Sequence, residues 1–193
     1  FSELIGILAM SKNLFTKCLA FEPEPNNFKM LSANVALNGL SKKFELHNEA
    51  LSNKLTESLS FELSKNNFGD HRVRITDQQG LHAEHKRDTI TVNVNTLDNV
   101  CNSINLDDCL IFMDAQGFEG HILYGAKSLV DAGVPIVTEF WPYGLLRSDG
   151  LDMFYSIMEK ANYTTMYDLR QPEKKLIFSI DEIRNIAKEL VMD

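Results

Sequence analysis

The sequence predicts an α/β fold with a doubly wound, mostly parallel sheet and an antiparallel edge strand. Predicted strands and helices alternate along the chain, which is the pattern of parallel sheets joined by helices. Residues 109–113 form an uninterrupted apolar run, typical of a strand buried on both faces. The last two predicted strands follow one another without a helix, which places an antiparallel strand at the edge. At 193 residues, we expect a single domain over residues 1–193.

The first half of the chain begins with a helix over residues 2–12, whose apolar residues recur at helical spacing. A short apolar strand follows at residues 17–21, and the next helix covers residues 28–37, ended by Asn38 and Gly39. Alternating apolar and polar residues then predict strands at residues 44–51, 59–63, 71–75 and 89–94.

The second half opens with a short helix near Thr96 or Leu97 and the apolar strand within residues 108–114. A helix over residues 120–130 ends before Gly133, and Asp181 is the expected N-cap of the last helix. The remaining elements are predicted strands at residues 135–140, 163–169 and 175–180, and helices at residues 152–161 and 181–191.

Residues 66–87 are polar and contain Gly69 and Gly80, which predicts an excursion or mobile loop of the kind that often carries function. His82 and His85 lie close together in this segment. Two neighbouring loop histidines without a third ligand do not make a metal site, so we expect no metal.

Composition excludes several classes of function. The net charge of −8 and the isoelectric point near 5.1 argue against nucleic acid as the main partner, because phosphate binding needs a basic face. No apolar run approaches the roughly 18 residues that span a bilayer. Three scattered cysteines without C-x-x-C spacing indicate buried thiols in a reducing compartment, and we expect a cytoplasmic protein. The oligomeric state cannot be read from the sequence.

Three acidic residues fall at the ends of predicted strands, namely Glu22, Asp114 and Glu139. In open α/β sheets, ligands bind beyond the carboxyl ends of the strands, where an acidic side chain can accept both hydrogen bonds of a ribose diol. Glu22 is therefore the first candidate for a nucleoside contact. The alternative is an acidic residue near the start of the next helix, favoured by the helix dipole.

The segment Asp114-Ala115-Gln116-Gly117-Phe118-Glu119-Gly120 is the second candidate site. An acid leaves a buried strand, a glycine permits an unusual turn, and Glu119 lies near the next helix start. Asp114 has the chemistry to hold an ammonium group or to remove a proton from a nucleophile. The alternative for Glu119 is helix capping.

Two segments together resemble the FkbM-type S-adenosylmethionine-dependent methyltransferases. They are residues 19–40, with A-F-E-P-E-P-N-N-F-K-M-L-S-A-N-V-A-L-N-G-L, and residues 111–126, with D-A-Q-G-F-E. Residues 49–52, 96–98 and 135–139 fall in the matching order, so the resemblance covers about residues 1–140.

The resemblance implies a class I, Rossmann-like methyltransferase fold with S-adenosylmethionine as cofactor. Glu22 would bind the ribose hydroxyls, Glu49 and Ala50 would lie beside the adenine, and Asp114 would lie near the methionine end and the acceptor. Gln116, Glu119, Glu139 and Asn67 are the candidate substrate-binding residues. The resemblance places Asn67 in an acceptor-side loop, and the alternative for Asn67 is a plain turn. Gln116 stands where many members have a glutamate, so it keeps the hydrogen bonding without the charge.

The family's first strand and glycine-rich loop would lie before Phe1, so we expect the chain to be incomplete at its N-terminus. Methyl transfer to a hydroxyl needs positioning and a base. Asp114 is the expected base, with Glu139 or His71 in reserve, and residues 141–144 are a candidate acceptor wall.

The resulting prediction is an O-directed methyltransferase that acts on a small molecule or a sugar hydroxyl. Two other classes stay open. An acidic strand end also suits the ribose of NAD in an oxidoreductase, and a degenerate methyltransferase-like domain could serve as a non-catalytic binding module.

Overall fold

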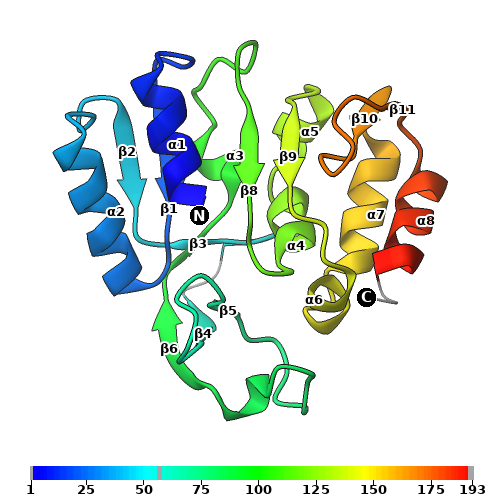
Figure 1. Cartoon of the computed structure of the whole chain (residues 1–193), viewed down its shortest axis with the longest axis horizontal. Helices are drawn as coiled ribbons and strands as arrows, with labels where there is room; N and C mark the ends of the chain where they lie inside the picture. The colour runs from blue at the N-terminus through cyan, green and yellow to red at the C-terminus, as the bar shows by residue number, and fades with distance from the viewer. Residues whose placement is uncertain (1, 56–57, 191–193) are drawn as a thin grey trace. The chain divides into compact units, whose positions relative to one another are not determined.

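The computed structural model describes residues 2–55 and 58–190, and it divides the chain into two units. Unit 1 is Phe1–Thr96 and unit 2 is Leu97–Asp193. Figure 1 traces the elements of both units along the chain.

Unit 1 contains two α-helices, one 3₁₀ turn and seven strands among its described residues. They are α1 (Ser2–Ser11), β1 (Cys18–Phe21), α2 (Pro25–Leu37), β2 (Phe44–His47), β3 (Ala50–Leu51), β4 (Leu59–Leu63), β5 (Arg72–Val73), η1 (Glu84–Lys86), β6 (Asp88–Val92) and β7 (Val94–Asn95). Strands β1 and β2 pair in parallel, as do β3 and β7, whereas β4 pairs antiparallel with both β5 and β6.

Helix α2 begins and ends at residues suited to those positions. Pro25 occupies its first turn, and the carboxylate of Glu24 caps it by accepting the Asn27 N–H at 2.6 Å. Gly39 follows the helix with φ +68°, a conformation that favours glycine. The N-cap role considered for Glu22 therefore belongs to Glu24, two residues further on.

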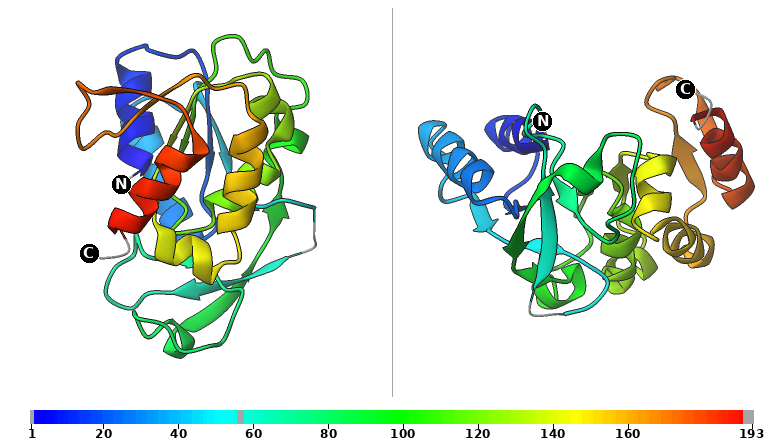
Figure 2. Two further views of the ribbon diagram at one scale, coloured as in Figure 1. Left: turned by 90° about the vertical axis from the view of Figure 1, so that its right-hand side faces the viewer. Right: turned by 90° about the horizontal axis from the view of Figure 1, so that it is seen from below.

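The core of unit 1 lies between α1, α2 and the β1–β2 pair. Figure 2 shows the two helices side by side against these strands. The buried residues of this cluster are Ile7, Met10, Leu31, Val35 and Leu40, and Cys18, Ala20, Phe44 and Leu46 of the strands pack against them. This packing fixes the carboxyl ends of β1 and β2, where Glu22 and Glu49 follow.

Two strands predicted as continuous are interrupted. Residues 44–51 form β2 and β3, separated at Asn48 and Glu49, because β2 pairs with β1 while β3 pairs with β7. Residues 88–95 form β6 and β7 for the same reason, since β6 belongs to the antiparallel sheet and β7 does not. This three-stranded sheet extends away from the β1–β2 pair (Figures 1 and 2).

Unit 2 contains six α-helices and four strands among its described residues. They are α3 (Leu97–Val100), β8 (Ile111–Met113), α4 (Glu119–Tyr124), α5 (Lys127–Asp131), β9 (Ile136–Thr138), α6 (Pro142–Arg147), α7 (Leu151–Lys160), β10 (Thr165–Tyr167), β11 (Lys175–Ile177) and α8 (Ile180–Leu190). Strands β8 and β9 pair in parallel, and β10 and β11 form a separate antiparallel pair. The antiparallel pairing of the last two strands is confirmed, while their place at the edge of a larger sheet stays a prediction.

The helix predicted over residues 120–130 is two helices. The Asp98 N–H donates to the Gly125 carbonyl, and the Asp98 carboxylate accepts the Ser128 N–H at 3.0 Å and the Ser128 hydroxyl. These bonds from α3 end α4 and begin α5 at the same place. Tertiary contacts therefore override the helical periodicity of the sequence.

The apolar run before Asp114 differs from the prediction of a strand buried on both faces. Ile111 and Met113 are buried, whereas Leu110 and Phe112 are 43% and 38% exposed. Strand β8 has β9 as its partner, and the core of unit 2 lies on the face to which Ile111 and Met113 point. The apolar run predicted the strand correctly, but its prediction that both faces of the strand are buried is wrong.

The last helix also begins differently from the prediction. The Ser179 hydroxyl accepts the Glu182 N–H at 3.1 Å, so Ser179 is the N-cap and Asp181 lies within the first turn of α8. Asp181 is still favourably placed there, because acidic residues stabilise the first turn of a helix.

The protein is thus a mixed α/β structure whose small sheets are mostly parallel, which is compatible with a methyltransferase-like fold. Across residues 2–55 and 58–190, no helix is both long enough and apolar enough to cross a bilayer.

Candidate functional site

Two of the acidic strand ends meet in unit 2, as the sequence predicts for parallel neighbours. Asp114 follows β8 and Glu139 follows β9, and the Glu139 N–H donates to the Met113 carbonyl at 3.2 Å. The side-chain amide of Gln116 lies between the two carboxylates. It donates to Asp114 Oδ1 at 2.7 Å and approaches Glu139 Oε2 at 3.3 Å. Three of the predicted site residues therefore form one polar group at the carboxyl ends of paired strands.

The backbone of this turn is unusual. Gln116 has φ +52° and Gly117 has φ +93°, so two consecutive residues adopt the left-handed region. This conformation is uncommon for a residue with a Cβ atom and is typical of sites where the surrounding structure holds the chain. It turns the Gln116 side chain toward both carboxylates.

Glu119 lies beneath the turn rather than beside the two exposed carboxylates. Its side chain is fully buried, and its Oε1 accepts the Ala115 N–H at 2.8 Å and approaches the Gly117 N–H at 3.4 Å. Burial raises the pKa of Glu119, although the backbone hydrogen bonds oppose this shift. The predicted contact between Glu119 and an acceptor stays untested, and the structure places its carboxyl group on the backbone of residues 115–117.

The proposed aromatic wall is the beginning of a helix that the sequence did not predict. Helix α6 begins at Pro142, and a Cβ atom added to Gly117 would lie 2.3 Å from the Gly144 carbonyl carbon, so the two backbones touch. The rings of Trp141 and Tyr143 lie 5.3 Å apart, tilted by 50°. Residues 141–144 therefore lie directly against the Asp114–Phe118 turn.

In unit 1, Glu22 and Glu49 follow the ends of two paired parallel strands. Phe21 and His47 are partners in the β1–β2 register, and their rings stack at 4.6 Å. The Glu22 carboxylate accepts the Glu24 N–H at 2.7 Å, which fixes it at the start of the turn. The predicted strand-end position of Glu22 is therefore confirmed, while its ligand stays a prediction.

Glu49 is held by two side chains. Asn95 donates to both of its oxygens at 3.2 and 3.3 Å, and His47 Nδ1 lies 3.1 Å from Oε1. Ala50 is buried and donates its N–H to the Asn93 carbonyl at 2.8 Å. Because that N–H is already bonded, a contact between Ala50 and an adenine ring would be apolar.

Asn67 forms a plain turn, which is the simpler of its two interpretations. Its Oδ1 accepts the Gly69 N–H at 3.0 Å, the bonding of an Asx turn. The same turn is tied to the start of α2, because Asn27 donates to the Phe68 carbonyl at 3.0 Å. The turn around Asn67 is thus anchored three residues from the Glu24 cap, and its role toward an acceptor stays a prediction.

The environment of His71 disfavours it as a base. Its Nδ1 accepts the Ser64 N–H at 2.9 Å, so in the neutral ring the proton resides on Nε2. Burial lowers the pKa of His71, while the charges of Glu24 and Asp70 oppose this shift. In this neutral ring Nε2 carries the proton and acts as a hydrogen-bond donor, so it cannot accept a proton from an acceptor hydroxyl. Asp114 and Glu139 are therefore the better candidates for the base.

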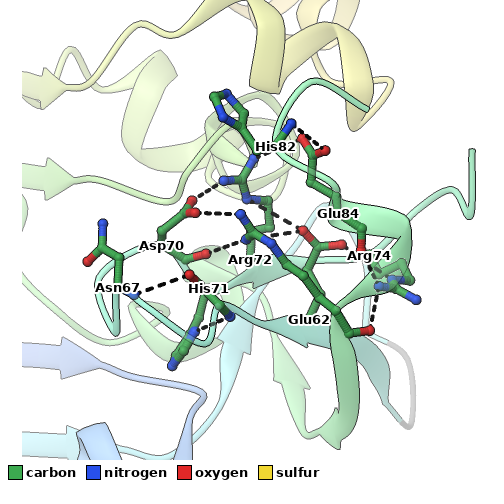
Figure 3. Close-up of polar contacts among 10 residues, drawn as sticks. Glu62, Asn67, Asp70, His71, Arg72, Arg74, His82 and Glu84 are labelled. Atoms are coloured by element: carbon green, nitrogen blue, oxygen red, sulfur yellow. Dashed lines mark hydrogen bonds and ion pairs between the residues drawn. The ribbon is translucent and has the colours of Figure 1, made fainter. Parts of the chain in front are cut away.

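Residues 62–87 contain a network of buried charges that the sequence did not predict (Figure 3). Glu62 is 2% exposed and lies 3.3 to 3.6 Å from the side chains of three arginines, which are Arg72, Arg74 and Arg87. Asp70 pairs with Arg72 and Arg87, and the buried Glu84 lies 3.7 Å from Arg72. Glu62, Asp70 and Glu84 balance the three arginines inside the network, and the exposed Asp77 pairs with Arg74 at 3.3 Å from its outer side.

The network organises the segment expected to be an excursion. Arg74 donates to the Glu84 and Arg87 carbonyls at 2.6 and 2.9 Å, and Arg87 donates to the Asp70 carbonyl at 2.7 Å. Burial raises the pKa of Glu62, and the neighbouring arginines oppose this shift. One feature of the sequence could have indicated this network. Residues 71–74, H-R-V-R, place two arginines on or directly after a strand that pairs with the strand containing Glu62.

In the described part of the chain, no three His, Cys, Asp or Glu residues gather in a geometry that could hold a metal ion. The backbone N–H of His82 donates to Glu84 Oε2 at 3.0 Å, and the absence of a metal at His82 and His85 stays a prediction.

The family model described as the methyltransferase FkbM domain matches residues 7–171. No curated protein and no solved structure matches the chain. Because the family model covers most of the 193 residues, including every candidate site residue, the chain belongs to the FkbM methyltransferase domain family.

Proposed function

We propose that the protein is an S-adenosylmethionine-dependent methyltransferase that methylates a hydroxyl group of a small molecule or a sugar. The observation that carries the proposal is the polar group of Asp114, Gln116 and Glu139 at the ends of β8 and β9. It occurs in a chain of a methyltransferase family, at a position where open α/β sheets bind ligands. The proposal includes one doubly wound, Rossmann-like sheet within a single domain, across which the family match extends.

The residues of unit 1 have the chemistry for the nucleoside half of this cofactor. We assign the ribose hydroxyls to the Glu22 carboxylate, which is fixed at the end of β1 by the Glu24 N–H. Glu49, held by Asn95 and His47, follows the neighbouring strand and suits the amino group of adenine. Carboxylates accept hydrogen bonds from both kinds of donor.

When bound, the cofactor supplies a methyl group on a positively charged sulfur. Asp114 would accept the proton of the acceptor hydroxyl, and the acceptor oxygen would then be free to receive the methyl group. The Gln116 amide fixes Asp114 Oδ1, so that the carboxylate points in one direction. Glu139, bonded to the same amide, orients a second hydroxyl of the acceptor.

The same group supports the proposed class of acceptor. Asp114 and Glu139 are exposed acceptors, and the Trp141–Tyr143 pair lies at the adjacent turn. Carboxylates and an amide beside aromatic rings suit a polyhydroxylated molecule, whereas the net charge of −8 disfavours nucleic acid. The three cysteines are free thiols, and we place the reaction in the cytoplasm.

Replacing Asp114 with Asn is expected to lower kcat by about 10²- to 10⁴-fold, the usual contribution of a positioned base. The assay measures transfer of a labelled methyl group from S-adenosylmethionine to a panel of methyl glycosides and phenols. Asp108→Asn is the matched control, because it removes the same charge at the opposite end of β8. If D114N binds the cofactor and keeps the wild-type kcat, Asp114 is not the base.

A further inference from the structure

The turn between β8 and α4 contains backbone N–H groups that have no strand or helix partner. Gln116 and Gly117 both have positive φ, and the Ala115 and Gly117 N–H groups point to a buried side chain instead of a strand or helix partner. Buried N–H groups are costly to leave without an acceptor. The turn that carries Asp114 and Gln116 is therefore stable only if buried side chains bind its backbone.

Glu119 supplies that acceptor. Its Oε1 accepts the Ala115 N–H at 2.8 Å and lies 3.4 Å from the Gly117 nitrogen, and its side chain has no exposed surface. Its Oε2 is buried without a hydrogen-bond partner in the part of the chain that the structure describes. One oxygen thus binds two amides of the turn from below.

The opposite side of the turn is also held. The Ser148 hydroxyl donates to the Gly117 carbonyl at 2.7 Å, and His121 Nε2 lies 2.7 Å from the Ser148 carbonyl. A Cβ atom on Gly120 would lie 1.9 Å from the Gly150 carbonyl oxygen, so α4 and the start of α7 are in backbone contact. Both polar groups of the Gly117 backbone are consequently bound by buried side chains.

We propose that Glu119 is a positioning residue that holds the Asp114–Gly117 turn through its Oε1 and so orients Asp114 and Gln116 toward the acceptor. This inference rests on the proposed function, because it assigns Glu119 a role in supporting the proposed base. It is proposed in place of a direct contact between Glu119 and the acceptor, because the Glu119 side chain is fully buried and its Oε1 already binds two backbone amides.

The single tryptophan of the chain reports on this turn. Trp141 packs against Gly144, where an added Cβ would lie 2.3 Å from its ring, and Gly144 in turn touches Gly117. A shift of the turn therefore changes the surroundings of the Trp141 ring. Its fluorescence is independent of any methyl acceptor.

The test compares Glu119→Ala with Glu119→Gln. Alanine removes the acceptor, so E119A is expected to shift the Trp141 emission to the red and to lower the melting temperature by on the order of 5 °C. It is also expected to lower kcat for methyl transfer by about 10²-fold, with KM for S-adenosylmethionine unchanged. Glutamine keeps the amide-binding oxygen and is expected to restore the wild-type emission and most of kcat.

Leu129→Ala is the control for a general loss of packing. Leu129 is buried in α5, so its truncation destabilises unit 2 without touching the turn. L129A is expected to keep the wild-type emission and kcat at temperatures where it is folded. If E119A and L129A behave alike, Glu119 is only a core residue and the proposal fails.

A second outcome would also overturn the proposal. If E119Q loses kcat as fully as E119A, the charge of Glu119 matters and a direct contact with the acceptor is favoured. If the wild type binds no S-adenosylmethionine, the proposed function fails, while the Trp141 emission of E119A and E119Q still decides whether Glu119 holds the turn.

The pH dependence of stability gives an independent readout. Burial raises the pKa of Glu119 above its ordinary value of 4.5. The folded protein then retains a proton that the unfolded chain releases, so the stability contributed is complete below pH 4.5 and is lost as the pH rises through the raised pKa. As the pH rises through the raised pKa of Glu119, the melting temperature of the wild type is expected to fall relative to that of E119Q.

Discussion

Replacing Glu62 with leucine is expected to lower the free energy of unfolding by about 3–5 kcal/mol, the usual cost of breaking a buried ion pair. Glu62 is 2% exposed and lies within 3.6 Å of Arg72, Arg74 and Arg87. Its removal leaves three arginines against Asp70 and Glu84, so one buried positive charge loses its partner. The measurement is urea unfolding followed by far-ultraviolet circular dichroism, because Trp141 lies in unit 2 and Glu62 in unit 1.

A double variant separates charge balance from packing. Glu62→Leu with Arg72→Met leaves two arginines against two acids, so it is expected to lose less than the sum of the single variants. Arg170→Met is the control at an exposed pair with Asp168, where removal costs at most about 1 kcal/mol. Additive losses in the double variant would show that the network is not coupled.

Replacing Gly117 with alanine is expected to cost about 2–5 kcal/mol, which combines two separate penalties. The added Cβ would lie 2.3 Å from the Gly144 carbonyl carbon, and overpacking against backbone costs about 1–3 kcal/mol. The φ of +93° adds about 1–2 kcal/mol for a residue with a side chain. Because Gly117 carries the turn below Asp114, the variant is also expected to lose methyl transfer.

Gly133→Ala isolates the conformational penalty from the steric one. Gly133 has φ +75°, and a Cβ atom there would meet nothing within 4 Å. G133A is therefore expected to lose only about 1–2 kcal/mol and to keep its activity. Trp141 fluorescence during urea unfolding measures both variants, since both glycines lie in unit 2. Equal losses in G117A and G133A would contradict close packing of Gly117 on Gly144.

The sequence was sufficient to predict the main part of the candidate site. Asp114 and Glu139 meet because each follows an apolar parallel strand, and the carboxyl ends of parallel strands share an edge. Glu22 follows β1 for the same reason. A local pattern is enough for this prediction, because each acidic residue directly follows its strand in the sequence.

Long-range contacts account for what the sequence did not predict. The role of Glu119 depends on backbone amides turned inward by the positive φ of Gln116 and Gly117, which no propensity indicates. The break between α4 and α5 depends on bonds to Asp98, and the buried charges around Glu62 come from separate strands and turns. Such features arise from pairing across the fold and leave no periodic signal.

Binding of S-adenosylhomocysteine tests the central claim most directly. Titration calorimetry on the full chain is expected to show saturable binding that Glu22→Gln weakens by about 10- to 100-fold, the worth of a hydrogen bond to a charged acceptor. Asp88→Asn, which removes the same charge from an exposed position on β6, is expected to bind as the wild type does. Binding of NAD in place of S-adenosylhomocysteine, or of neither compound, would contradict the account.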